Sequence, residues 1–249
     1  MKTILITGAT SGIGFTLAKN YLAQGNRVII TGRSEEKLEH AKNQLGEYSD
    51  LLEVNLIDVR DEQKMKECLV ELDDKYKIDM IIANAGVSAG VSGKANFSEI
   101  GKEIFDINVY GVFNTVHPLI ERMKERKSGH IVLICSMSAF FGLTSAVFYA
   151  SSKAAIKSYG EGLRILMSDF GVDVTTVFPG FVESNITRSN KFKMMFLMDT
   201  QSAVDIIIKG LNAKKGYILF PKRMRALVYM ISILPFSIRE KILKRLPHK

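Results

Sequence analysis

The chain is poor in the residues that build disulfide frameworks and metal sites. Its 249 residues include only two cysteines, Cys68 and Cys135, and four histidines. Both cysteines fall in expected helices or strands rather than in paired loops, so we interpret them as reduced thiols of an intracellular protein. The histidines show no spacing typical of metal ligands, so we expect surface or packing roles for them and no metal. They are His40, His117, His130 and His248.

The sequence also lacks the long apolar runs of signals and membrane spans. Near the N-terminus, the apolar stretch 4–6 reaches a turn at Gly8, which is too short for a secretory signal. Near the C-terminus, 226–238 is an uncharged stretch of thirteen residues interrupted by Pro235, whereas a membrane-spanning helix needs about 20 residues. We therefore expect a cytoplasmic protein, with contact to the inner face of a membrane as an open alternative.

Positive charge is concentrated at the C-terminus. The net charge is +8, and 222–249 contributes +7 of it, from eight Lys or Arg against one acid. The preceding 221 residues hold 26 basic and 25 acidic residues. A nucleic-acid surface more often spreads its charge over a fold face with interleaved aromatics, so we expect no nucleic-acid partner. The basic, partly apolar extension 221–249 suits a membrane interface, a second subunit or the body of the protein, and all three stay open.

Apolar runs alternate with amphipathic stretches along most of the chain. The runs are rich in Ile, Val and Leu without clear alternation, which is typical of strands buried on both faces. This order predicts an α/β fold, a doubly wound, mostly parallel seven-stranded sheet with helices on both faces. The expected strands are 2–7, 27–31, 51–56, 79–83, 129–135, 172–178 and 217–220. The expected helices are 12–24, 34–46, 61–76, 97–126, 147–169 and 201–213. We expect one catalytic domain over 1–220 and an extension over 221–249.

A glycine-rich turn follows the first expected strand and opens the first expected helix. Glycine allows a tight turn and lets the backbone approach a pyrophosphate, while the helix N-terminus supplies free N–H groups and a positive dipole end. The sequence therefore predicts a dinucleotide site at this turn. The turn reads Thr7-Gly8-Ala9-Thr10-Ser11-Gly12-Ile13-Gly14.

The spacing Gly-x-x-x-Gly-x-Gly behind a threonine resembles that of the short-chain dehydrogenase/reductase family, and the resemblance spans residues 1 to about 220. It implies a Rossmann-type fold, hydride transfer between a nicotinamide and a carbonyl or alcohol carbon, and a homo-dimer or homo-tetramer. The same resemblance implies that the turn residues Gly8, Thr10, Ser11, Gly12, Ile13 and Gly14 hold the cofactor. It adds contacts after later strands, which are Asp58, Val59, Asn84, Ala85, Gly86, Pro179, Gly180, Val182 and Ser184.

Cofactor choice depends on the end of the second expected strand, which reads Gly32-Arg33-Ser34. A fold that binds NAD usually carries an acid here for the ribose 2′-hydroxyl. A carboxylate would repel a 2′-phosphate, whereas a guanidinium holds it through paired, charge-assisted bonds. By resemblance, Arg33 is the 2′-phosphate clamp of an NADP(H) site, with Ser34, Thr10 and Ser11 as hydroxyl partners; a solvated arginine at a helix start is the alternative.

The motif Tyr149-Ala-Ser-Ser-Lys153 places a phenol and an ammonium on one side of an expected helix, because residues four apart share a face. A neighbouring cation favours the phenolate, so we expect the pKa of Tyr149 to lie below its ordinary value of about 10. That shift would suit Tyr149 to general acid/base catalysis. The motif alone also occurs in helices by chance, so its neighbours decide the interpretation.

Asn108 and Ser136 also match the family, and with Tyr149 and Lys153 they occur in the family's order along the chain. Ser136 precedes Tyr149 by thirteen residues, the family spacing for the serine that hydrogen-bonds the substrate oxygen, whereas Ser138 precedes it by eleven. Asn108 matches the family asparagine that helps hold a water relaying protons to the lysine. Lys153 matches the lysine that also binds the nicotinamide ribose. The resemblance thus implies that Asn108, Ser136, Tyr149 and Lys153 are the catalytic residues.

Substrate information is confined to apolar segments around the expected site. Segment 184–200 follows the sixth expected strand, and its Met and Phe residues predict an adaptable apolar lid. Ordinary packing of a lid helix is the alternative. An apolar or lipid-like ketone or aldehyde suits these residues better than a sugar, which favours a carbonyl reductase. Further phenylalanines flanking the expected site are Phe140, Phe141, Phe148 and Phe181.

Three other functions are alternatives to a reductase. One is an NADP-binding scaffold without turnover, which the presence of both Tyr149 and Lys153 disfavours. A second is an epimerase or dehydratase of the longer related branch, which has a different glycine spacing and a larger C-terminal region. The third is a membrane-associated interaction protein in which 221–249 is the functional part.

Overall fold

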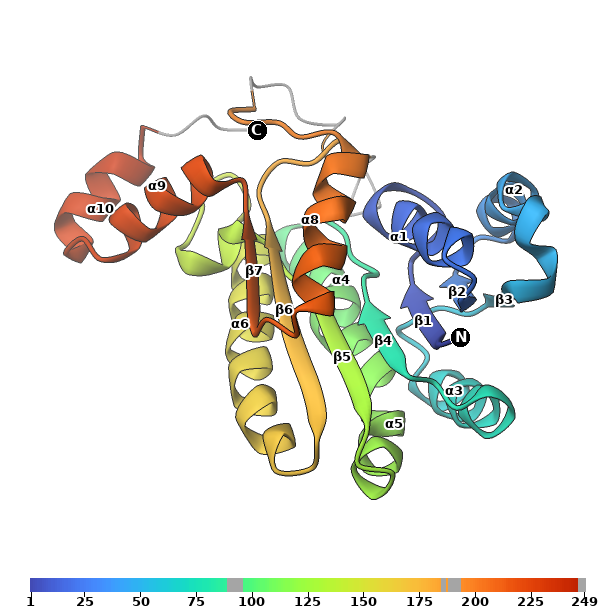
Figure 1. The fold of residues 1–249 in the computed structure, drawn as a ribbon. Coiled ribbons are helices and arrows are strands. Elements are labelled where there is room, and N and C mark those ends of the chain that lie inside the picture. The colour runs from blue at the N-terminus through green and yellow to red at the C-terminus, as the bar shows by residue number, and fades with distance from the viewer. Residues whose placement is uncertain (89–95, 185–186, 188–193, 246–249) are drawn as a thin grey trace.

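The computed structural model of the protein describes residues 1–88, 96–184, 187 and 194–245. Its strands form one sheet in the order β3-β2-β1-β4-β5-β6-β7, and every adjacent pair is parallel (Figure 1). The expected sheet is confirmed, and it is entirely rather than mostly parallel. The strands are β1 Thr3–Thr7, β2 Arg27–Gly32, β3 Leu52–Leu56, β4 Met80–Ala83, β5 Gly129–Ile134, β6 Val172–Pro179 and β7 Tyr217–Phe220.

The direction of sheet growth reverses between β1 and β4. From β1 the chain moves outward through β2 to β3, and it then returns to β4 and moves the other way to β7. In open parallel sheets, ligands bind in the crevice outside the carboxyl ends of the strands at such a reversal. The topology therefore places the expected site after β1 and β4.

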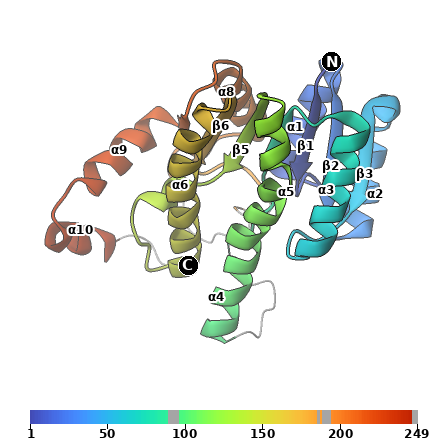
Figure 2. The ribbon, with the colours of Figure 1, turned by 90° about the horizontal axis from the view of Figure 1, so that it is seen from below.

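Helices cover both faces of the sheet, as expected. One face carries α3 (Glu62–Tyr76), α5 (Gly111–Glu125) and α6 (Val147–Ser168), which lie in front of the sheet in Figure 2. The other face carries α1 (Gly12–Ala23), α2 (Glu35–Gln44) and α8 (Thr200–Asn212). Successive side chains of a strand point to opposite faces. Accordingly, Leu5 packs in the core beneath α3, α5 and α6, while Ile4 and Ile6 pack in the core beneath α1, α2 and α8.

The helical stretch expected over 97–126 is present, with a π-helical turn in its middle that was not expected. The chain forms α4 (Phe97–Phe105), a π-helical turn η2 (Asp106–Tyr110) and then α5. A β-carbon on Gly111 would lie 2.6 Å from Cγ2 of Val59, so the helix passes very close to the segment after β3. Short 3₁₀ helices, η1 (Gly46–Leu51) and η3 (Met137–Phe140), lead into β3 and follow β5.

The chain after β7 forms two short helices, α9 (Lys222–Ser232) and α10 (Phe236–Leu243). We call residues 222–245 the C-terminal arm. Figure 1 shows the arm extending away from the sheet beyond its β7 edge. None of the described helices is both long and apolar enough to cross a membrane. The division of the chain at 220/221 into a catalytic domain and an extension stays a prediction.

Candidate active site

The glycine turn after β1 has the conformation that only glycine adopts easily. Gly8 has φ +64° and Gly12 has φ +57°, both in the left-handed region. A β-carbon on Gly8 would lie 2.7 Å from the Cα of Ala85, and one on Gly14 would collide with the side-chain amide of Asn84. The glycines therefore let the turn lie directly against the loop after β4.

Hydrogen bonds join this turn to the loop after β4. The Nδ2 of Asn84 donates to the carbonyl oxygens of Thr7 and Gly8, each at 3.0 Å. The buried Thr7 hydroxyl in turn accepts from the backbone N–H of Asn84 at 3.2 Å. The predicted cofactor residues Asn84 and Ala85 thus lie beside the turn, and the Asn84 side chain holds the turn in shape.

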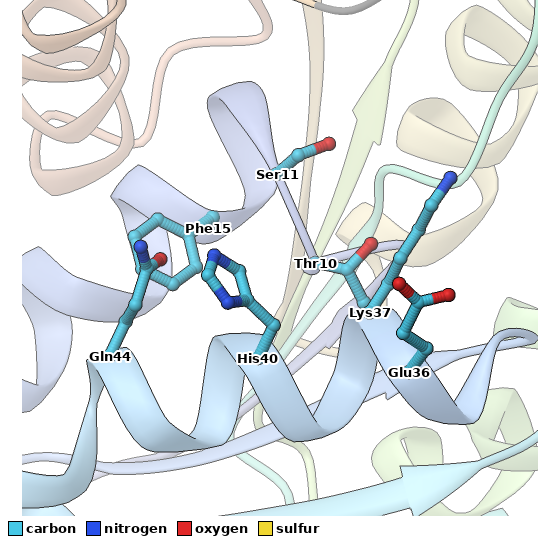
Figure 3. A pocket seen from close by; sticks show the side chains of 7 residues that line it. All are labelled: Thr10, Ser11, Phe15, Glu36, Lys37, His40 and Gln44. Atoms are coloured by element: carbon cyan, nitrogen blue, oxygen red, sulfur yellow. The ribbon is translucent and has the colours of Figure 1, made fainter.

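A cavity of about 510 Å³ lies between the glycine turn and α2. Figure 3 shows its lining, with Thr10 and Ser11 from the turn and Lys37 and His40 from α2. Sequence reasoning did not single out Lys37, and it assigned His40 only a surface or packing role. The signal that was available is helical spacing, because Glu36, His40 and Gln44 lie four residues apart on one face of α2. The remaining lining residues are Phe15, Glu36 and Gln44.

Arg33 lies at the end of β2, as predicted, and its side chain is exposed. The neighbouring Ser34 is the N-cap of α2, because its hydroxyl accepts from the backbone N–H of Lys37 at 3.4 Å. The Ser34 hydroxyl, expected as a partner of the cofactor, therefore also has a structural role.

Asp58 and Val59 follow β3, as predicted, and the Asp58 carboxylate is held by Arg60. The Arg60 guanidinium donates to Asp58 at 2.6 Å and its backbone N–H donates at 3.0 Å. Burial of Asp58 opposes ionisation, but the bonds from Arg60 and the charge of nearby Arg33 outweigh it, so the pKa of Asp58 is lowered. The structure thus presents an ionised carboxylate close to Arg33.

Three of the predicted catalytic residues meet at the carboxyl end of β5. Ser136 caps η3, and its hydroxyl accepts from the backbone N–H of Ser138 at 3.1 Å. The Ser136 side chain also lies close enough to the Tyr149 phenol to favour its phenolate form and so to lower its pKa. On the same side of α6, the Nζ of Lys153 lies 5.8 Å from the centroid of the Tyr149 ring and donates to the carbonyl of Ile134 at 2.9 Å.

The pKa of Tyr149 differs from the sequence-based expectation. Burial raises the pKa of Tyr149 to about 12, although the hydrogen bond with Ser136 acts in the opposite direction. The lowering expected from Lys153 is therefore wrong for the protein alone. Lys153 is itself buried, and burial lowers its own pKa. Desolvation disfavours the charged form of both groups and here outweighs their proximity.

Asn108 reaches the site from the π-helical turn and is completely buried. Its Oδ1 accepts from the backbone N–H of Val87 at 2.9 Å, and its Nδ2 donates to the Val87 carbonyl at 2.9 Å and to the Ser152 hydroxyl at 3.1 Å. The Ser152 hydroxyl donates to the carbonyl of Tyr149 at 2.8 Å. The Asn108 amide therefore clamps the loop after β4 to α6, and the water-holding role implied by the resemblance stays a prediction. Sequence reasoning missed Ser152, which carries no motif signal of its own.

The segment after β6 passes close to the glycine turn. The backbone N–H of Gly180 donates to the carbonyl of Phe220 at 2.8 Å, and Val182 pairs with Met198 in an isolated parallel bridge. A β-carbon on Gly12 would lie 3.4 Å from Cβ of Ser184. Ser184 therefore lies beside the glycine turn. The hydroxyl of Thr187 accepts from the backbone N–H of Ser184 at 2.9 Å, and the sequence did not predict this contact.

The predicted lid 184–200 is described only in part. Residues 185–186 and 188–193 lie outside the described residues. Among the expected aromatic neighbours, Phe140 packs against Phe178 and against Tyr229 of the C-terminal arm, at centroid distances of 5.3 and 5.6 Å. Phe148 packs against Phe97 at 4.5 Å. These rings are held by packing, and the contact with Tyr229 was not predicted.

With this geometry in view, comparison with known proteins settles the family. A family model for short chain dehydrogenases matches residues 2–194. The chain belongs to the short chain dehydrogenase family. The resemblance, the fold class and assignment to the oxidoreductases are therefore confirmed.

Three similar proteins illustrate the range of the family. An uncharacterized oxidoreductase of Myxococcus xanthus (strain DK1622) is 33% identical over 246 residues, covering 98% of this chain and 97% of that protein. Serine 3-dehydrogenase of Rhizobium radiobacter is 32% identical over 212 residues, covering 84% and 81%. The solved structure of a short-chain dehydrogenase from Sphingobium yanoikuyae in complex with NADPH has a TM-score of 0.81 at 21% identity, covering 99% and 97%.

The described residues of this short chain dehydrogenase fit a nicotinamide dinucleotide. The left-handed glycines leave the turn without β-carbons where a pyrophosphate would approach. The cavity beside Thr10 and Ser11 provides room next to that turn. Gly86 lies beside both Asn108 and Lys153, because a β-carbon there would lie 3.2 Å from the Asn108 Oδ1 and 3.6 Å from the Lys153 Nζ.

Proposed function

We propose that this protein is an NADP(H)-dependent carbonyl reductase that interconverts a ketone or aldehyde with an alcohol on an apolar, lipid-like substrate. The observation that carries the proposal is the meeting of Ser136, Tyr149 and Lys153 at the carboxyl end of β5. Together with Asn108, which clamps the surrounding backbone, they form the proposed catalytic group.

The chemistry of the step follows from these hydroxyls. NADPH, when bound, supplies the hydride that reduces the carbonyl carbon. The hydroxyls of Ser136 and Tyr149 hydrogen-bond the carbonyl oxygen and polarise it. As negative charge develops on that oxygen, Tyr149 donates its proton to it, which completes the alcohol. With its pKa raised to about 12, Tyr149 carries the proton near neutral pH, and efficient donation of that proton requires stabilisation of the phenolate that it leaves.

The phenolate left on Tyr149 needs stabilisation in a partly buried site. Lys153 supplies a positive charge 5.8 Å from the ring centroid, and Ser136 supplies a hydrogen bond. Both interactions are more favourable with the phenolate than with the phenol, which lowers the barrier to proton transfer. In the reverse direction the same phenolate accepts the proton of the alcohol.

For cofactor choice, we propose that Arg33 and Lys37 together hold the 2′-phosphate of NADP(H). Both are basic. Arg33 directly follows β2, and Lys37 lines the cavity beside Thr10 and Ser11. We expect NADPH to bind at least tenfold tighter than NADH, about 1.4 kcal/mol or more. Arg33→Ala should remove most of that preference and Lys37→Ala part of it, as measured by titration with both cofactors. Equal affinity of the unmutated protein for NADPH and NADH contradicts the assignment.

The apolar substrate class rests on the described part of the lid. Met195, Phe196 and Leu197 are large and exposed beside the segment that passes the glycine turn. A small polar hydroxy acid is the second candidate, since one relative at 32% identity is named serine 3-dehydrogenase. We also propose that the protein forms a homo-oligomer, as the family resemblance implies.

A turnover screen tests the proposed function. NADPH oxidation is measured with ketones of increasing chain length, including 3-keto lipids and steroids, and NADP⁺ reduction is measured with serine. We expect kcat/KM to rise by about fourfold for each methylene that becomes buried. Turnover of serine but of no ketone would favour the second candidate. No turnover with any substrate, despite tight NADPH binding, would favour the scaffold.

A further inference from the structure

The C-terminal arm leaves much of its own surface uncovered. Val228 and Ile231 of α9 are buried and pack toward the body, where α9 contacts β7 and η3. No residue of α10 is buried. Ile233 is 81% exposed and Phe236 is 67% exposed. Figure 1 agrees, since the arm extends outward from the edge of the sheet.

The uncovered surface of the arm is apolar. Ile233, which caps the end of α9, lies three positions from Met230 and four from Tyr229, and residues at these spacings are neighbours on a helix surface. Phe236 and Ile238 continue the exposed apolar surface onto α10. These five large, exposed side chains lie within ten residues of the chain. Such a concentration of exposed apolar surface indicates a site that contacts a partner or a membrane.

Basic residues flank this apolar surface on both sides. Between 222 and 245 the arm has seven basic residues and one acid, Glu240, which gives a net charge of +6. Among the described residues, the only ion pair of the arm joins Lys244 to Glu240 at 2.8 Å. The basic residues are Lys222, Arg223, Arg225, Arg239, Lys241, Lys244 and Arg245.

A second exposed apolar surface lies at the same edge of the sheet. The lid follows β6 and the arm follows β7, and the bases of the two segments are joined by the hydrogen bond from Gly180 to Phe220. Met195, Phe196 and Leu197 of the lid are exposed. The arm and the described part of the lid therefore both follow the carboxyl ends of adjacent parallel strands.

We propose that the C-terminal arm is a docking surface for an anionic lipid membrane, with the apolar side chains of α9 and α10 in the interface and the arginines and lysines on its headgroups. Exposed apolar side chains flanked by basic residues are the chemistry of helices that lie in a membrane interface. The eleven residues of α9 span only about 16 Å against a hydrocarbon core of about 30 Å, so the arm lies on the bilayer and does not cross it. The inference is independent of the proposed substrate.

Charge also argues against a second copy of this chain as the occupant. A symmetric contact between two arms would bring +6 against +6, and like charges facing each other across an interface are unfavourable. The first 221 residues have 26 basic and 25 acidic residues, so the body offers no excess of negative charge. An anionic lipid surface satisfies the basic residues and the apolar side chains together.

The full-length protein is tested by co-sedimentation with vesicles of phosphatidylcholine alone and with vesicles that contain about 30% phosphatidylserine. We expect at least tenfold tighter binding to the anionic vesicles and a loss of that binding as salt is raised. Equal binding to both vesicles, or none to either, overturns the proposal. Vesicle binding is measured without turnover. Failure of this test is therefore separate from failure of the proposed function.

Matched variants locate the binding surface. Ile233→Asp should weaken binding to anionic vesicles at least tenfold. Ile165→Asp should leave that binding unchanged, because Ile165 is similarly accessible, at 75% exposed, but lies near the C-terminal end of α6. Lys241→Gln should weaken binding about fivefold and Lys66→Gln on α3 should not. If Ile233→Asp fails to fold, Phe236→Ser on α10 provides the same test where nothing is buried. A change in oligomer size with unchanged vesicle binding assigns the arm to a subunit contact and overturns the proposal.

Discussion

Two opposing effects act on the proton of Tyr149. Burial raises its pKa to about 12, while the hydrogen bond with Ser136 stabilises the phenolate. The side chain is therefore a protonated acid at rest whose conjugate base has partners in place. A residue with this balance should matter for turnover and little for cofactor binding.

Tyr149→Phe should lower kcat by at least about 10²-fold, the low end for removal of a general acid. NADPH affinity should stay within about twofold of the unmutated protein. Tyr159→Phe is the matched control, because it removes the phenol hydroxyl of a half-buried tyrosine from the same helix, where that hydroxyl lies 3.1 Å from His117. Steady-state turnover and cofactor titration check both variants, and near-full activity of Tyr149→Phe would require another proton donor.

The two serines after β5 should respond differently to removal of their hydroxyls. Ser136 bonds to Tyr149 and accepts from the Ser138 backbone, whereas the buried Ser138 hydroxyl has no hydrogen-bond partner among the described residues. Ser136→Ala should lower kcat/KM at least tenfold. Ser138→Ala should change kcat/KM less than about twofold and leave urea stability unchanged or higher, because it removes an unsatisfied group. The opposite order of the two effects identifies Ser138 as the substrate-binding serine.

Sequence alone predicted the residues that belong to a spaced motif and missed those that act through tertiary contact. Tyr149 and Lys153 are four residues apart on one helix, so their meeting is local. Ser152 receives its bond from Asn108, 44 residues away in the chain, and Lys37 meets Thr10 only after α2 packs beside the glycine turn. The pKa of Tyr149 was predicted in the wrong direction because burial, which no spacing reveals, outweighs the nearby cation.

At the scale of elements, strands were easier to predict than the π-helical turn between α4 and α5. The expected strands match the observed ones to within a residue or two, because a strand buried on both faces is a continuous apolar run. The π-helical turn at 106–110 has no such pattern. It coincides with the close approach of Gly111 to Val59 and with the clamp formed by Asn108, both of which are long-range contacts.

The glycine turn offers a prediction with an internal control. Gly8 and Gly25 both have positive φ, +64° and +74°, but a β-carbon on Gly8 would lie 2.7 Å from Ala85 while one on Gly25 meets nothing within 4 Å. Both alanine variants should carry a backbone strain of about 1 kcal/mol. Gly8→Ala should in addition displace the turn and weaken NADPH binding at least tenfold, whereas Gly25→Ala should bind NADPH normally. Equal cofactor affinities in the two variants would show that the turn does not depend on this close approach.

At the scale of the whole molecule, the chain separates a near-neutral body from a basic arm. The sequence predicted this separation but left open what 226–238 contacts. The structure answers in part, because Val228 and Ile231 are buried while Ile233 and Phe236 are exposed. Part of the apolar stretch thus packs on the body, and the rest faces outward. Hydropathy alone could not separate the buried residues of this stretch from the exposed ones, since both kinds are apolar.

His130 connects stability to pH in the middle of the sheet. It lies on β5 with its side chain buried, and its Nε2 is 2.8 Å from the Thr175 hydroxyl on β6. The Thr175 hydroxyl donates to the carbonyl of Lys215 at 2.7 Å, so the imidazole serves as the donor to Thr175 in its neutral form. Burial lowers the pKa of His130 to about 4, against opposition from Asp173, and the nearby positive charges add to the lowering. Those charges are Lys214, Lys2 and Arg164.

The low pKa of His130 predicts a loss of stability in mild acid. Unfolded chains protonate histidine below about pH 6.5, whereas the folded protein resists protonation until about pH 4. The contribution of His130 is therefore fully present above pH 6.5 and is lost as pH falls toward 4, which amounts to about 2 kcal/mol at pH 5. Urea unfolding at pH 7.5 and pH 5 should show this decrease in the unmutated protein, and the decrease should be about 2 kcal/mol smaller in His130→Gln. The variant should also be less stable at pH 7.5, because the bond to Thr175 is disturbed. The same decrease in both proteins would mean that other groups, and not the imidazole on β5, set the acid limit of the fold.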